Sequence, residues 1–552
     1  MDHALVVAVI VGGSAILSLP LGAYMKWAMD PEGAQGAGWT ALFERVGGSA
    51  GGQGWTGYLV TMLVFNAVMF TVTFAILATQ HLLPLNPDAK GALNPDLVFN
   101  TAASFATNTN LQHYSGEVSM SHLSQLAGLM WLQFVSAATG IAALAALARG
   151  IAGRADMGNF MVDVQRAAFL VLLPLALLVA PAMVILGMPM TLQGAVTATG
   201  LEGAGQTIAR GPVAAFLTIK QLGTNGGGFF GPNATHPLEN PSFWTNLIAM
   251  VAIMLIPMAC VWMFGRIVGR MRHAAVIFAV MAGFILLKIA GAVGLESAPT
   301  AAFAGLPVAD APNLEGKELR LGATTGPLWA VLTTATSNGS VGAMHDSLNP
   351  LTGLVPMVGM WLNATFGGVG VGMINMLLYI VVAVFVAGMM VGRTPEYLGH
   401  RIEAREVRLA VLALLSHAVL ILGGTALFAA TAWGQGAVQE AGPHGFSEIL
   451  YEFSSAGANN GSGFEGLGDG SVAFNVATGL VMLLGRFLPI ILPFAIVGSL
   501  MRKRRAAESA GTLGVEDATF GTMLAITVVI FGALTFLPAA ALGPIAEHVS
   551  LP

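Results

Sequence analysis

Ten apolar runs alternate with polar loops along the chain, at roughly residues 5–25, 58–80, 124–148, 166–188, 243–265, 274–295, 355–391, 406–430, 473–500 and 520–543. A helix needs about 20 apolar residues to cross the hydrocarbon core of a bilayer. The first run has no basic segment before it, so we interpret it as a retained helix and not as a cleaved signal peptide. The pattern predicts an all-α polytopic membrane protein with ten transmembrane helices.

Four of the polar loops contain an apolar segment of about ten residues, which is too short to span a membrane. The segments LVFNTAASF, VAAFLTIKQL, GPLWAVLTT and FSEILYEFSS are followed by ATNTNLQ (106–112), GTNGGGF (223–229), ATSNGSV (335–341) and GANNGSG (457–463). One such Asn- and Gly-containing stretch alone would be interpreted as a surface turn. Four of them favour re-entrant hairpins around a pore, because irregular backbone at membrane depth must be buried or line a water-filled path.

The repeated unit consists of a span, a short helix, a polar loop and a second span. Aligning the four stretches on their asparagines gives spacings of 117, 113 and 122 residues between Asn108, Asn225, Asn338 and Asn460. The predicted fold has four pseudo-symmetric helix–pore loop–helix repeats with one extra helix at each end. The expected boundaries are 1–57 for the first extra helix and its loop, 58–160, 161–272, 273–402 and 403–510 for the repeats, and 511–552 for the last helix.

Three successive glycines, Gly226, Gly227 and Gly228, indicate how such a loop could bind an ion. Glycine adopts positive φ without steric cost, so successive carbonyl oxygens can turn toward one side. Carbonyl oxygens replace the hydration shell of a cation, and the carboxyl end of the preceding short helix adds partial negative charge. Thr224 and Asn225 are expected to add side-chain oxygens, and the loop is expected to face water.

The four loop cores contain no carboxylate, which favours a monovalent cation over Ca²⁺ or Mg²⁺. We expect the ion-binding filter to comprise Thr107, Asn108, Thr109, Asn110, Gln112, Thr224, Asn225, Gly226, Gly227, Gly228, Thr336, Ser337, Asn338, Gly339, Ala458, Asn459, Asn460 and Gly461.

The longest apolar run contains the sequence FGGVGVG, residues 366–372, near its middle. Glycine disfavours a helix interior by roughly 1 kcal/mol relative to alanine, so we predict a break there. The break is interpreted as a gate below the filter, and close packing of small residues between helices is the alternative. The expected gate residues are Gly367, Gly368, Gly370 and Gly372.

Two basic residues lie within apolar runs. Arg486 lies deep inside its run, where a charge usually faces a cavity or a partner, so we expect it to lie on the ion path. A structural role in capping helix carbonyls is the alternative for Arg486. Lys288 lies nearer the end of its run and is expected to extend its ammonium group toward the interface.

Composition and charge restrict the class of protein and its orientation. Hydrophobic residues make up 55% of the chain and charged residues only 9%, which excludes a soluble globular protein. Basic residues are retained on the cytoplasmic side, and most of them fall in alternate loops, among them Arg154, Arg272, Arg393 and Arg505. Both termini are therefore predicted on the outer face. The opposite loops are rich in acidic residues and would attract cations.

Several kinds of chemistry have no sequence signal. The single cysteine, Cys260, excludes an internal disulfide framework and a multi-cysteine zinc site. The sequence has neither a GxxxxGK[ST] phosphate loop nor a DKTGT phosphorylation motif, so the chain alone is not expected to hydrolyse ATP. We predict no catalytic residue and no organic cofactor. Without a metal motif such as HExxH, five histidines are interpreted as loop residues, namely His81, His113, His122, His236 and His345.

Five stretches carry a family resemblance: TNTNLQHYSGE (107–117), TNGGGFFGPNATHPLENP (224–241), ATSNGSVGAMHDSLNPL (335–351), VGRTPEYLGHRIEAREV (391–407) and SSAGANNGSGFEGL (454–467). Over nearly its whole length the chain resembles the potassium-translocating, channel-like subunit of the Kdp-type bacterial K⁺-transporting ATPase. The resemblance implies a chain folded four times into the unit that simple K⁺ channels build from four chains. It also implies K⁺ as the transported ion, the bacterial inner membrane, and a complex with a P-type ATP-hydrolysing subunit and small accessory membrane subunits.

Two other functions are compatible with parts of the pattern. An ion-gradient-driven K⁺ or Na⁺ symporter of the same superfamily would also need four filter loops. A membrane scaffold that only assembles other subunits would not need them. The resemblance favours the ATP-driven transporter over both, and adjacent genes for a P-type ATPase subunit would separate it from the symporter.

Overall fold

The structure is a computed structural model that describes residues 3–31, 36–48, 50–300, 303, 305–307, 311–392, 394–505 and 513–551. Arg393, which belongs to the predicted basic loops, lies outside the described residues, as do Met1 and Asp2 at the amino terminus. The described chain is mostly helical, with two small two-stranded sheets. This confirms the predicted all-α class.

Ten helical segments of the described chain are long and apolar enough to cross a membrane, as predicted. Their helices are α1 (His3–Val7) with α2 (Gly13–Met29), α4 (Trp55–Ala78), α7 (Trp131–Ile151), α8 (Phe160–Arg166) with α9 (Leu173–Ile185), α11 (Phe243–Val268), α12 (Met271–Ser297), α15 (Val371–Val391), α16 (Ala404–Ala429), α19 (Val472–Leu500) and α20 (Ala518–Leu542). Three of these segments include a π-helical turn, at Ala8–Gly12, Ser124–Met130 and Ala167–Leu172.

Burial separates the spans into an inner and an outer set. The second span of each repeat is the more buried one: 94% of the apolar window is buried for the segment containing α7, 78% for α11, 83% for α15 and 50% for α19. The first spans, which contain α4, α8 with α9, α12 and α16, are 22–33% buried. In a chain with many membrane-spanning helices, a helix that exposes large apolar side chains faces lipid. The second spans therefore surround the centre and the first spans cover them.

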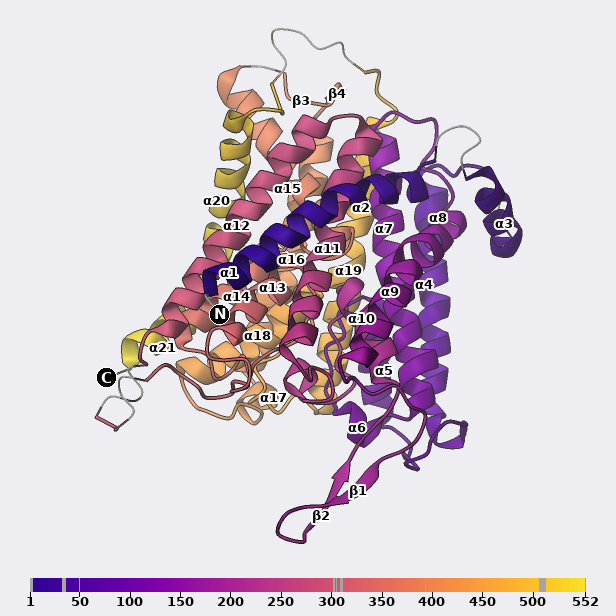
Figure 1. Ribbon diagram of the computed structural model, residues 1–552. Helices are drawn as coiled ribbons and strands as arrows, with labels where there is room; N and C mark the ends of the chain where they lie inside the picture. Colours follow the sequence, from indigo (N-terminus) through magenta and orange to yellow (C-terminus); the bar gives the residue numbers. More distant parts are fainter. Residues whose placement is uncertain are drawn as a thin grey trace.

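Four short helices point from one face toward the centre of the molecule and fill its lower half in Figure 1. They are α5 (Pro95–Ala106), α10 (Val213–Leu222), α13 (Thr325–Ala335) and α18 (Pro443–Ala458). Each lies between the two spans of its repeat, which confirms the predicted span, short helix, loop, span unit. Proline begins α5 and α18, where its missing N–H has no intrahelical acceptor to lose.

The third repeat departs from the other three, as the FGGVGVG sequence predicted. Its second span is divided into α14 (Pro350–Leu362) and α15, and residues 363–370 between them are not helical. Phe366, Gly367, Gly368 and Gly370 all have positive φ, a region that ordinary helix residues avoid. The predicted run 355–391 is therefore two helices with a break between them.

The remaining elements lie at the two faces. Strands β1 (Val196–Thr199) and β2 (Gly205–Ile208) pair antiparallel in a hairpin that projects below the bundle in Figure 1. Strands β3 (Glu396–Tyr397) and β4 (His400–Arg401) pair at the opposite face. The short surface helices are α3 (Ala37–Gly47), α6 (Gly116–Ser119), α17 (Ala432–Gln435) and α21 (Pro544–Ser550), with 3₁₀ turns at Gln80–Leu82 and Asn233–Thr235. The apolar pattern predicted none of them.

Candidate ion-binding ring

The loops after α5, α10, α13 and α18 share one backbone conformation. In each loop one main-chain N–H donates to the carbonyl oxygen five residues earlier: Thr109 to Ser104 at 2.9 Å, Asn225 to Lys220 at 2.9 Å, Asn338 to Thr333 at 2.8 Å and Asn460 to Ser455 at 2.9 Å. The flanking residues on both sides have positive φ, namely Asn108 and Asn110, Thr224 and Gly226, Ser337 and Gly339, and Asn459 and Gly461. Thr109 is thus the equivalent of Asn225, and the sequence alignment on Asn108 is wrong by one residue.

The four loops contact one another in a closed ring. The Cα atom of Gly226 faces the carbonyl oxygen of Asn338 in the third loop. In the same way Gly339 faces the fourth loop at Asn460, and Gly461 faces the first loop at Thr109. The first and second loops are joined through Gln112, whose Nε2 donates to the Gly228 carbonyl oxygen at 3.0 Å and whose Oε1 accepts from the Gly228 N–H at 2.6 Å.

At the same position in every loop, the main-chain carbonyl oxygen has no hydrogen-bond donor among the described residues. These are the oxygens of the four equivalent residues, Thr109, Asn225, Asn338 and Asn460, all of which are fully buried. Buried carbonyl groups are nearly always paired, so four unpaired ones in a closed ring require an explanation. Such a ring can replace the hydration shell of a cation.

Other predicted filter oxygens are held by the protein. The Gly226 carbonyl accepts from Asn233 Nδ2 at 2.8 Å, and the Gly228 carbonyl accepts from Gln112. Residues 221–230 are all buried, so the expectation that the second loop faces water is wrong. The loop is enclosed by its neighbours in the ring.

Side chains of the predicted filter residues bridge adjacent loops. Their amide and hydroxyl groups reach across all four seams: Asn108 Nδ2 donates to Thr224 O at 2.8 Å, Asn338 Nδ2 to Lys220 O at 3.2 Å, Ser337 Oγ to Ala458 O at 3.3 Å, Asn460 Nδ2 to Thr333 O at 2.9 Å and Asn459 Nδ2 to Thr109 Oγ1 at 2.9 Å. Thr107 Oγ1 lies 2.7 Å from Thr109 Oγ1, and Thr336 Oγ1 donates to Leu332 O. These contacts fix the spacing of the loops.

The ring is not fully symmetric, because the first loop carries an asparagine where the others carry glycine. Gly226, Gly339 and Gly461 have φ of 84°, 91° and 106°, and a Cβ atom on any of them would collide with the next loop's backbone. Asn110 is the equivalent residue of the first loop and has a φ of 55°. Both polar atoms of its buried side chain lack a hydrogen-bond partner in the described residues.

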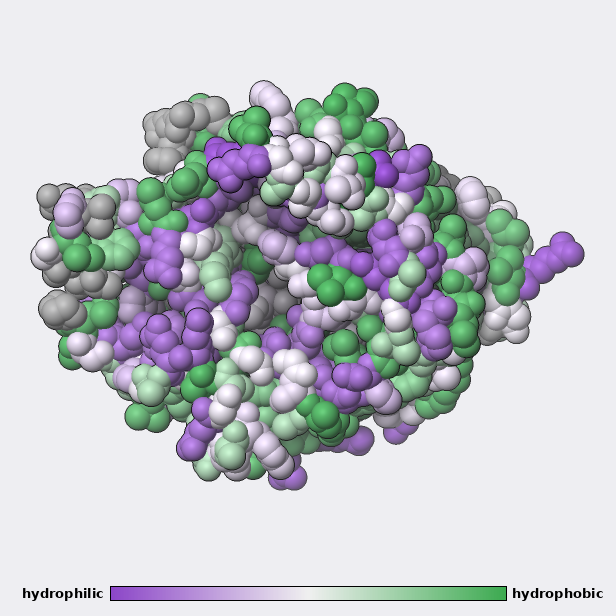
Figure 2. Space-filling view, turned by 90° about the horizontal axis from the view of Figure 1, so that it is seen from below, coloured by the Kyte–Doolittle hydropathy of each residue, from purple (hydrophilic) through white to green (hydrophobic). Residues whose placement is uncertain are grey.

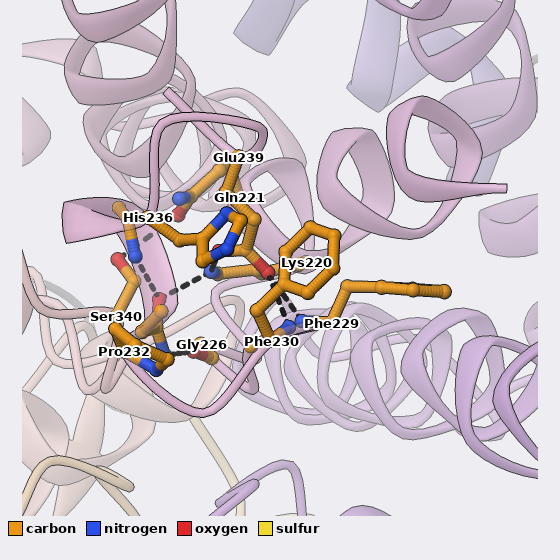
Figure 3. A network of polar contacts seen from close by, with 12 residues as sticks. Lys220, Gln221, Gly226, Phe229, Phe230, Pro232, His236, Glu239 and Ser340 are labelled. Carbon is orange, nitrogen blue, oxygen red and sulfur yellow. Dashed lines mark hydrogen bonds and ion pairs between the residues drawn. The ribbon is translucent and has the colours of Figure 1, made fainter. Parts of the chain in front are cut away.

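A buried ion pair anchors the second loop (Figure 3). Lys220 Nζ lies 3.0 Å from Glu239 Oε2, and both side chains are fully buried. The other carboxylate oxygen of Glu239 accepts from the N–H groups of Phe229 and Phe230. Lys220 Nζ also donates to Asn233 Oδ1, and this asparagine is the one that holds the Gly226 carbonyl. The pair therefore determines the position of the glycine segment.

The break in the third repeat lies against the second and third loops. The Gly367 N–H donates to Ala335 O at 2.9 Å, at the carboxyl end of α13. The Val369 N–H donates to Thr224 Oγ1 at 3.1 Å, so the side-chain oxygen expected of Thr224 is engaged by the break. Gly370 packs against the Gly140 carbonyl on α7, where a Cβ atom would collide. Of the expected gate glycines, Gly367 and Gly368 thus contact the ring segments, whereas Gly370 contacts α7 and Gly372 lies in the first turn of α15.

Arg486 lies on α19 and contacts the ring indirectly. Its guanidinium Nη2 donates to Ser136 O on α7 at 3.0 Å, and the residue is 4% exposed. Ser136 Oγ in turn donates to Asn108 Oδ1 at 2.9 Å and accepts from Asn225 Nδ2 at 3.2 Å. No carboxylate of the described chain pairs with Arg486. The expected position on an ion path is therefore next to the first and second loops, outside the ring itself.

The face that carries α6 and α17 is hollowed near its centre (Figure 2). A cavity of about 520 Å³ on this side is lined by the segments that follow all four loops, including Ser115, Pro232, Met344 and Glu465. Glu465 Oε2 accepts from the His345 N–H at 2.8 Å, and burial raises the pKa of its carboxyl to about 8. The cavity forms a vestibule outside the ring.

His113 is a residue whose position the sequence did not indicate. It lies behind the first loop, where Nε2 is 3.1 Å from Glu452 Oε1 and Nδ1 is 2.7 Å from Asn475 Oδ1. Burial acts against the charged form, but Asp469 and Glu452 raise the pKa of His113 to about 9. The first and fourth repeats are therefore joined by a buried ion pair. No local spacing could reveal it, because its partner is 339 residues away.

Lys288 does not extend toward the interface. The residue is 8% exposed, and its ammonium nitrogen has no hydrogen-bond partner among the described residues. It lines an apolar cavity of about 310 Å³ between α12, α14 and α20. The expectation that it snorkels is wrong, because α12, α14 and α20 bury the side chain beside this cavity.

Comparisons with known proteins agree over nearly the whole chain. The family model described as "Potassium-transporting ATPase A subunit" matches residues 7–549. A curated relative from Rhodospirillum centenum, the potassium-transporting ATPase potassium-binding subunit, is 50% identical over 506 residues, 90% of this chain and 88% of the relative. The crystal structure of the potassium transporter TrkH from Vibrio parahaemolyticus has a TM-score of 0.53 and 14% identity, covering 89% of this chain and 98% of its own. At that identity the likeness concerns the fold alone.

Proposed function

Because the chain belongs to the family of potassium-transporting ATPase A subunits, we propose that it is the K⁺-binding and K⁺-translocating subunit of an ATP-driven, high-affinity potassium uptake complex. K⁺ enters from the outer face and is selected by the four re-entrant loops. One observation carries the proposal: the equivalent carbonyl oxygens of Thr109, Asn225, Asn338 and Asn460 are buried in a closed ring and accept no hydrogen bond from the described residues.

The proposed chemistry is exchange of water for carbonyl oxygen. A K⁺ ion leaves its hydration shell in the vestibule and gains main-chain oxygens in the ring. The carboxyl ends of α5, α10, α13 and α18 meet at the ring, and their partial negative charge stabilises the ion without a carboxylate. Hydrogen bonds across the seams keep the oxygens from collapsing onto a smaller ion. Selectivity then depends on the scaffold as well as on the ligands.

The route inward is proposed to pass the break between α14 and α15. Gly367, Gly368, Gly370 and Gly372 act as the gate, which is supported by the contacts of this segment with Thr224 and Ala335. A fixed positive charge at Arg486 beside Ser136 raises the energy of a cation below the ring, and so limits how far K⁺ moves before the gate opens.

The partners proposed are a P-type ATP-hydrolysing subunit and small accessory membrane subunits of the same complex, with K⁺ as the cargo and no organic cofactor. The chain itself is a non-hydrolytic subunit, since its sequence has no phosphate loop or phosphorylation motif.

We propose that the chain lies in the bacterial inner membrane with both termini on the outer face. Cysteines introduced at positions 154, 401 and 503 should not react with an impermeant thiol reagent added outside intact cells. Labelling of all three would show that the orientation is the opposite of the one proposed.

The proposed organisation is four pore repeats, at about 58–160, 161–272, 273–402 and 403–510, with extra helices in 1–57 and 511–552.

The gradient-driven symporter is the alternative function, and transport by the purified complex distinguishes the two functions. In proteoliposomes, K⁺ uptake should require ATP and should be unaffected when ionophores collapse the Na⁺ and H⁺ gradients. Uptake that persists without ATP and stops with the gradients would identify a symporter.

A further inference from the structure

A second group of polar side chains lies on the outer face, where the third repeat, the fourth repeat and α21 meet. Asp346 follows the third ring loop, while His444 and Glu448 lie in the first turns of α18. The two α18 residues are four positions apart, so their side chains share one face of the helix. One ligand atom from each of the three residues lies within 4.8 Å of the others, a separation that a single metal ion can bridge.

His444 is oriented as metal-bound histidines usually are. Its Nδ1 lies 2.9 Å from Glu547 Oε1, and its Nε2 lies 3.1 Å from Asp346 Oδ1. A carboxylate that accepts the N–H of Nδ1 orients the ring so that Nε2, which faces Asp346, is the nitrogen that could bind a cation beside that carboxylate. The side chains of His444 and Asp346 are 17% and 11% exposed, so an ion from the outer solution can reach them. Glu448 lies deeper and is fully buried.

Gly466 provides an independent geometric observation. The point that a Cβ atom on Gly466 would occupy lies 2.5 Å from Gln439 Oε1, 2.7 Å from Asp346 Oδ2 and 2.7 Å from Glu448 Oε1. Three oxygens from three separate segments thus converge beside a residue that has no side chain. A side chain at position 466 would fill the space toward which these oxygens point.

The charges in this group are not balanced by the protein. Asp346, Glu448 and Glu547 surround one imidazole, and no Lys or Arg of the described chain forms an ion pair with them. Buried charges are usually paired or coordinate a metal ion, so a bound cation would balance this excess of negative charge.

We propose that Asp346, His444 and Glu448, assisted by the side-chain oxygen of Gln439, form a binding site for a first-row divalent cation such as Zn²⁺ or Mn²⁺. An imidazole nitrogen among the ligands favours these ions over Mg²⁺ and Ca²⁺, which prefer oxygen alone. The bound ion joins the third repeat to α18, whose other end carries Asn459 and Asn460 of the ring. It therefore stabilises the seam between the third and fourth loops. The site is separate from the K⁺ ring and does not depend on the proposed transport function.

A similar group, His113 with Glu452 and Asp469, does not support the same proposal. The side chains of His113 and Glu452 are 0% and 2% exposed, so an ion from solution does not reach them as it reaches His444 and Asp346. No comparable convergence of oxygens beside a glycine accompanies it, since the atom nearest to a Cβ on Gly463 is 3.9 Å away.

The test measures metal binding by the full chain, purified, stripped with a chelator and dialysed against Zn²⁺. The wild type is expected to retain one Zn²⁺ per chain and to gain thermal stability from it. His444→Asn and Glu448→Gln should lose both effects. Gly466→Ala removes no charge but places a Cβ atom among the ligand oxygens, so its Zn²⁺ affinity should fall at least tenfold. His81→Asn, which changes an exposed histidine elsewhere, should behave as wild type.

X-ray absorption at the zinc edge gives a readout that does not depend on the variants. The wild-type spectrum should fit one imidazole nitrogen with oxygen ligands. The proposal is overturned if the wild type retains no Zn²⁺ or Mn²⁺, if the His444 variant retains a full equivalent, or if the spectrum contains no imidazole. Competition by Mg²⁺ or Ca²⁺ at equal concentration would overturn the assigned class of ion.

Discussion

The main-chain carbonyl oxygen of Asn338 occupies the space that a Cβ atom on Gly226 would need. The same relation joins Gly339 to Asn460 and Gly461 to Thr109, so three seams of the ring require glycine. The loops are therefore as close as their backbones allow. A small displacement at one seam must move a carbonyl oxygen of the next loop.

Substitution of Gly226 by alanine tests this packing. Alanine at φ 84° costs about 1–2 kcal/mol of backbone strain, and its Cβ atom displaces the Asn338 carbonyl. Because 1.4 kcal/mol corresponds to tenfold in affinity, K⁺ affinity should fall by roughly tenfold or more. Rb⁺, NH₄⁺ and Na⁺ should compete better, since the positions of the ligands have changed.

The measurement is ion-stimulated ATPase activity of the reconstituted complex, titrated with K⁺ and with each competitor. Gly91→Ala is the matched control, because Gly91 is exposed and has no atom within 4 Å of its Cβ position. An unchanged K⁺ affinity in a well-assembled Gly226→Ala complex would contradict the close packing of the ring.

Much of the fold could be predicted from the sequence because its signals are local. The segment VAAFLTIKQL forms α10 over the predicted residues, and the break at FGGVGVG follows from glycine's poor helix propensity. The register of the first loop could not be predicted, because Thr109 has an asparagine on each side and either could be aligned with Asn225. The hydrogen bond from Thr109 to Ser104 and the positive φ of both neighbours of Thr109 identify the equivalent residue.

Contacts between distant segments account for the rest of what the sequence did not indicate. The Gly226 carbonyl is held by Asn233, which lies beyond the loop, and the ring contact to Asn338 crosses more than a hundred residues. His444 contacts Asp346, which is 98 residues before it, and Glu547, which is 103 residues after it. Such groups have no spacing signature, because folding alone brings their members together.

The Lys220–Glu239 pair should be essential to the second loop. Lys220→Met leaves the Glu239 carboxylate buried without its partner, which typically costs about 3–5 kcal/mol. We expect a lower thermal unfolding temperature and a weaker K⁺ affinity. The double variant Lys220→Met with Glu239→Gln should recover part of both, because the buried charge is gone and the Gln oxygen can still accept from Phe229.

Thermal unfolding of the purified chain and K⁺ titration of the complex check this expectation. Arg154→Met removes a half-exposed ion pair with Asp30 and serves as the control, with an expected effect below about 1 kcal/mol. Equal effects of the Lys220 and Arg154 variants would mean that the buried pair does not anchor the loop.

Arg486→Met should impair transport without preventing assembly. A neutral side chain inserts into the membrane more easily than arginine, so expression should not fall. The contact with Ser136 is lost, and with it the fixed charge beside the first and second loops. K⁺ uptake into proteoliposomes should lose most of its rate, whereas Arg502→Met, at an exposed position just beyond α19, should not. Normal uptake by the Arg486 variant would leave the arginine a structural role only.

The pair formed by His113 and Glu452 should make stability depend on pH. The pKa of His113 is raised from 6.5 to about 9, because Asp469 and Glu452 outweigh the effect of burial. A raised folded-state pKa gives stabilisation that is complete below pH 6.5 and is lost as the pH rises through about 9. His113→Gln can still donate to Glu452 but does not titrate.

The unfolding temperatures of wild type and His113→Gln should therefore differ most near pH 6.5. They should converge above about pH 9. Scanning fluorimetry in detergent over this range makes the comparison. A difference that grows with rising pH would mean that His113 is neutral in the folded protein.

Four main-chain carbonyl oxygens, one from each loop, are proposed to bind the transported ion. Thallous ion has the same charge as K⁺ and nearly the same size, and it scatters X-rays anomalously. Crystals of the complex grown in Tl⁺ therefore locate the site directly. We expect an anomalous peak enclosed by the four loops and in contact with the carbonyl oxygens of Thr109, Asn225, Asn338 and Asn460. A strong peak elsewhere in the chain, with none at these four oxygens, would contradict the account.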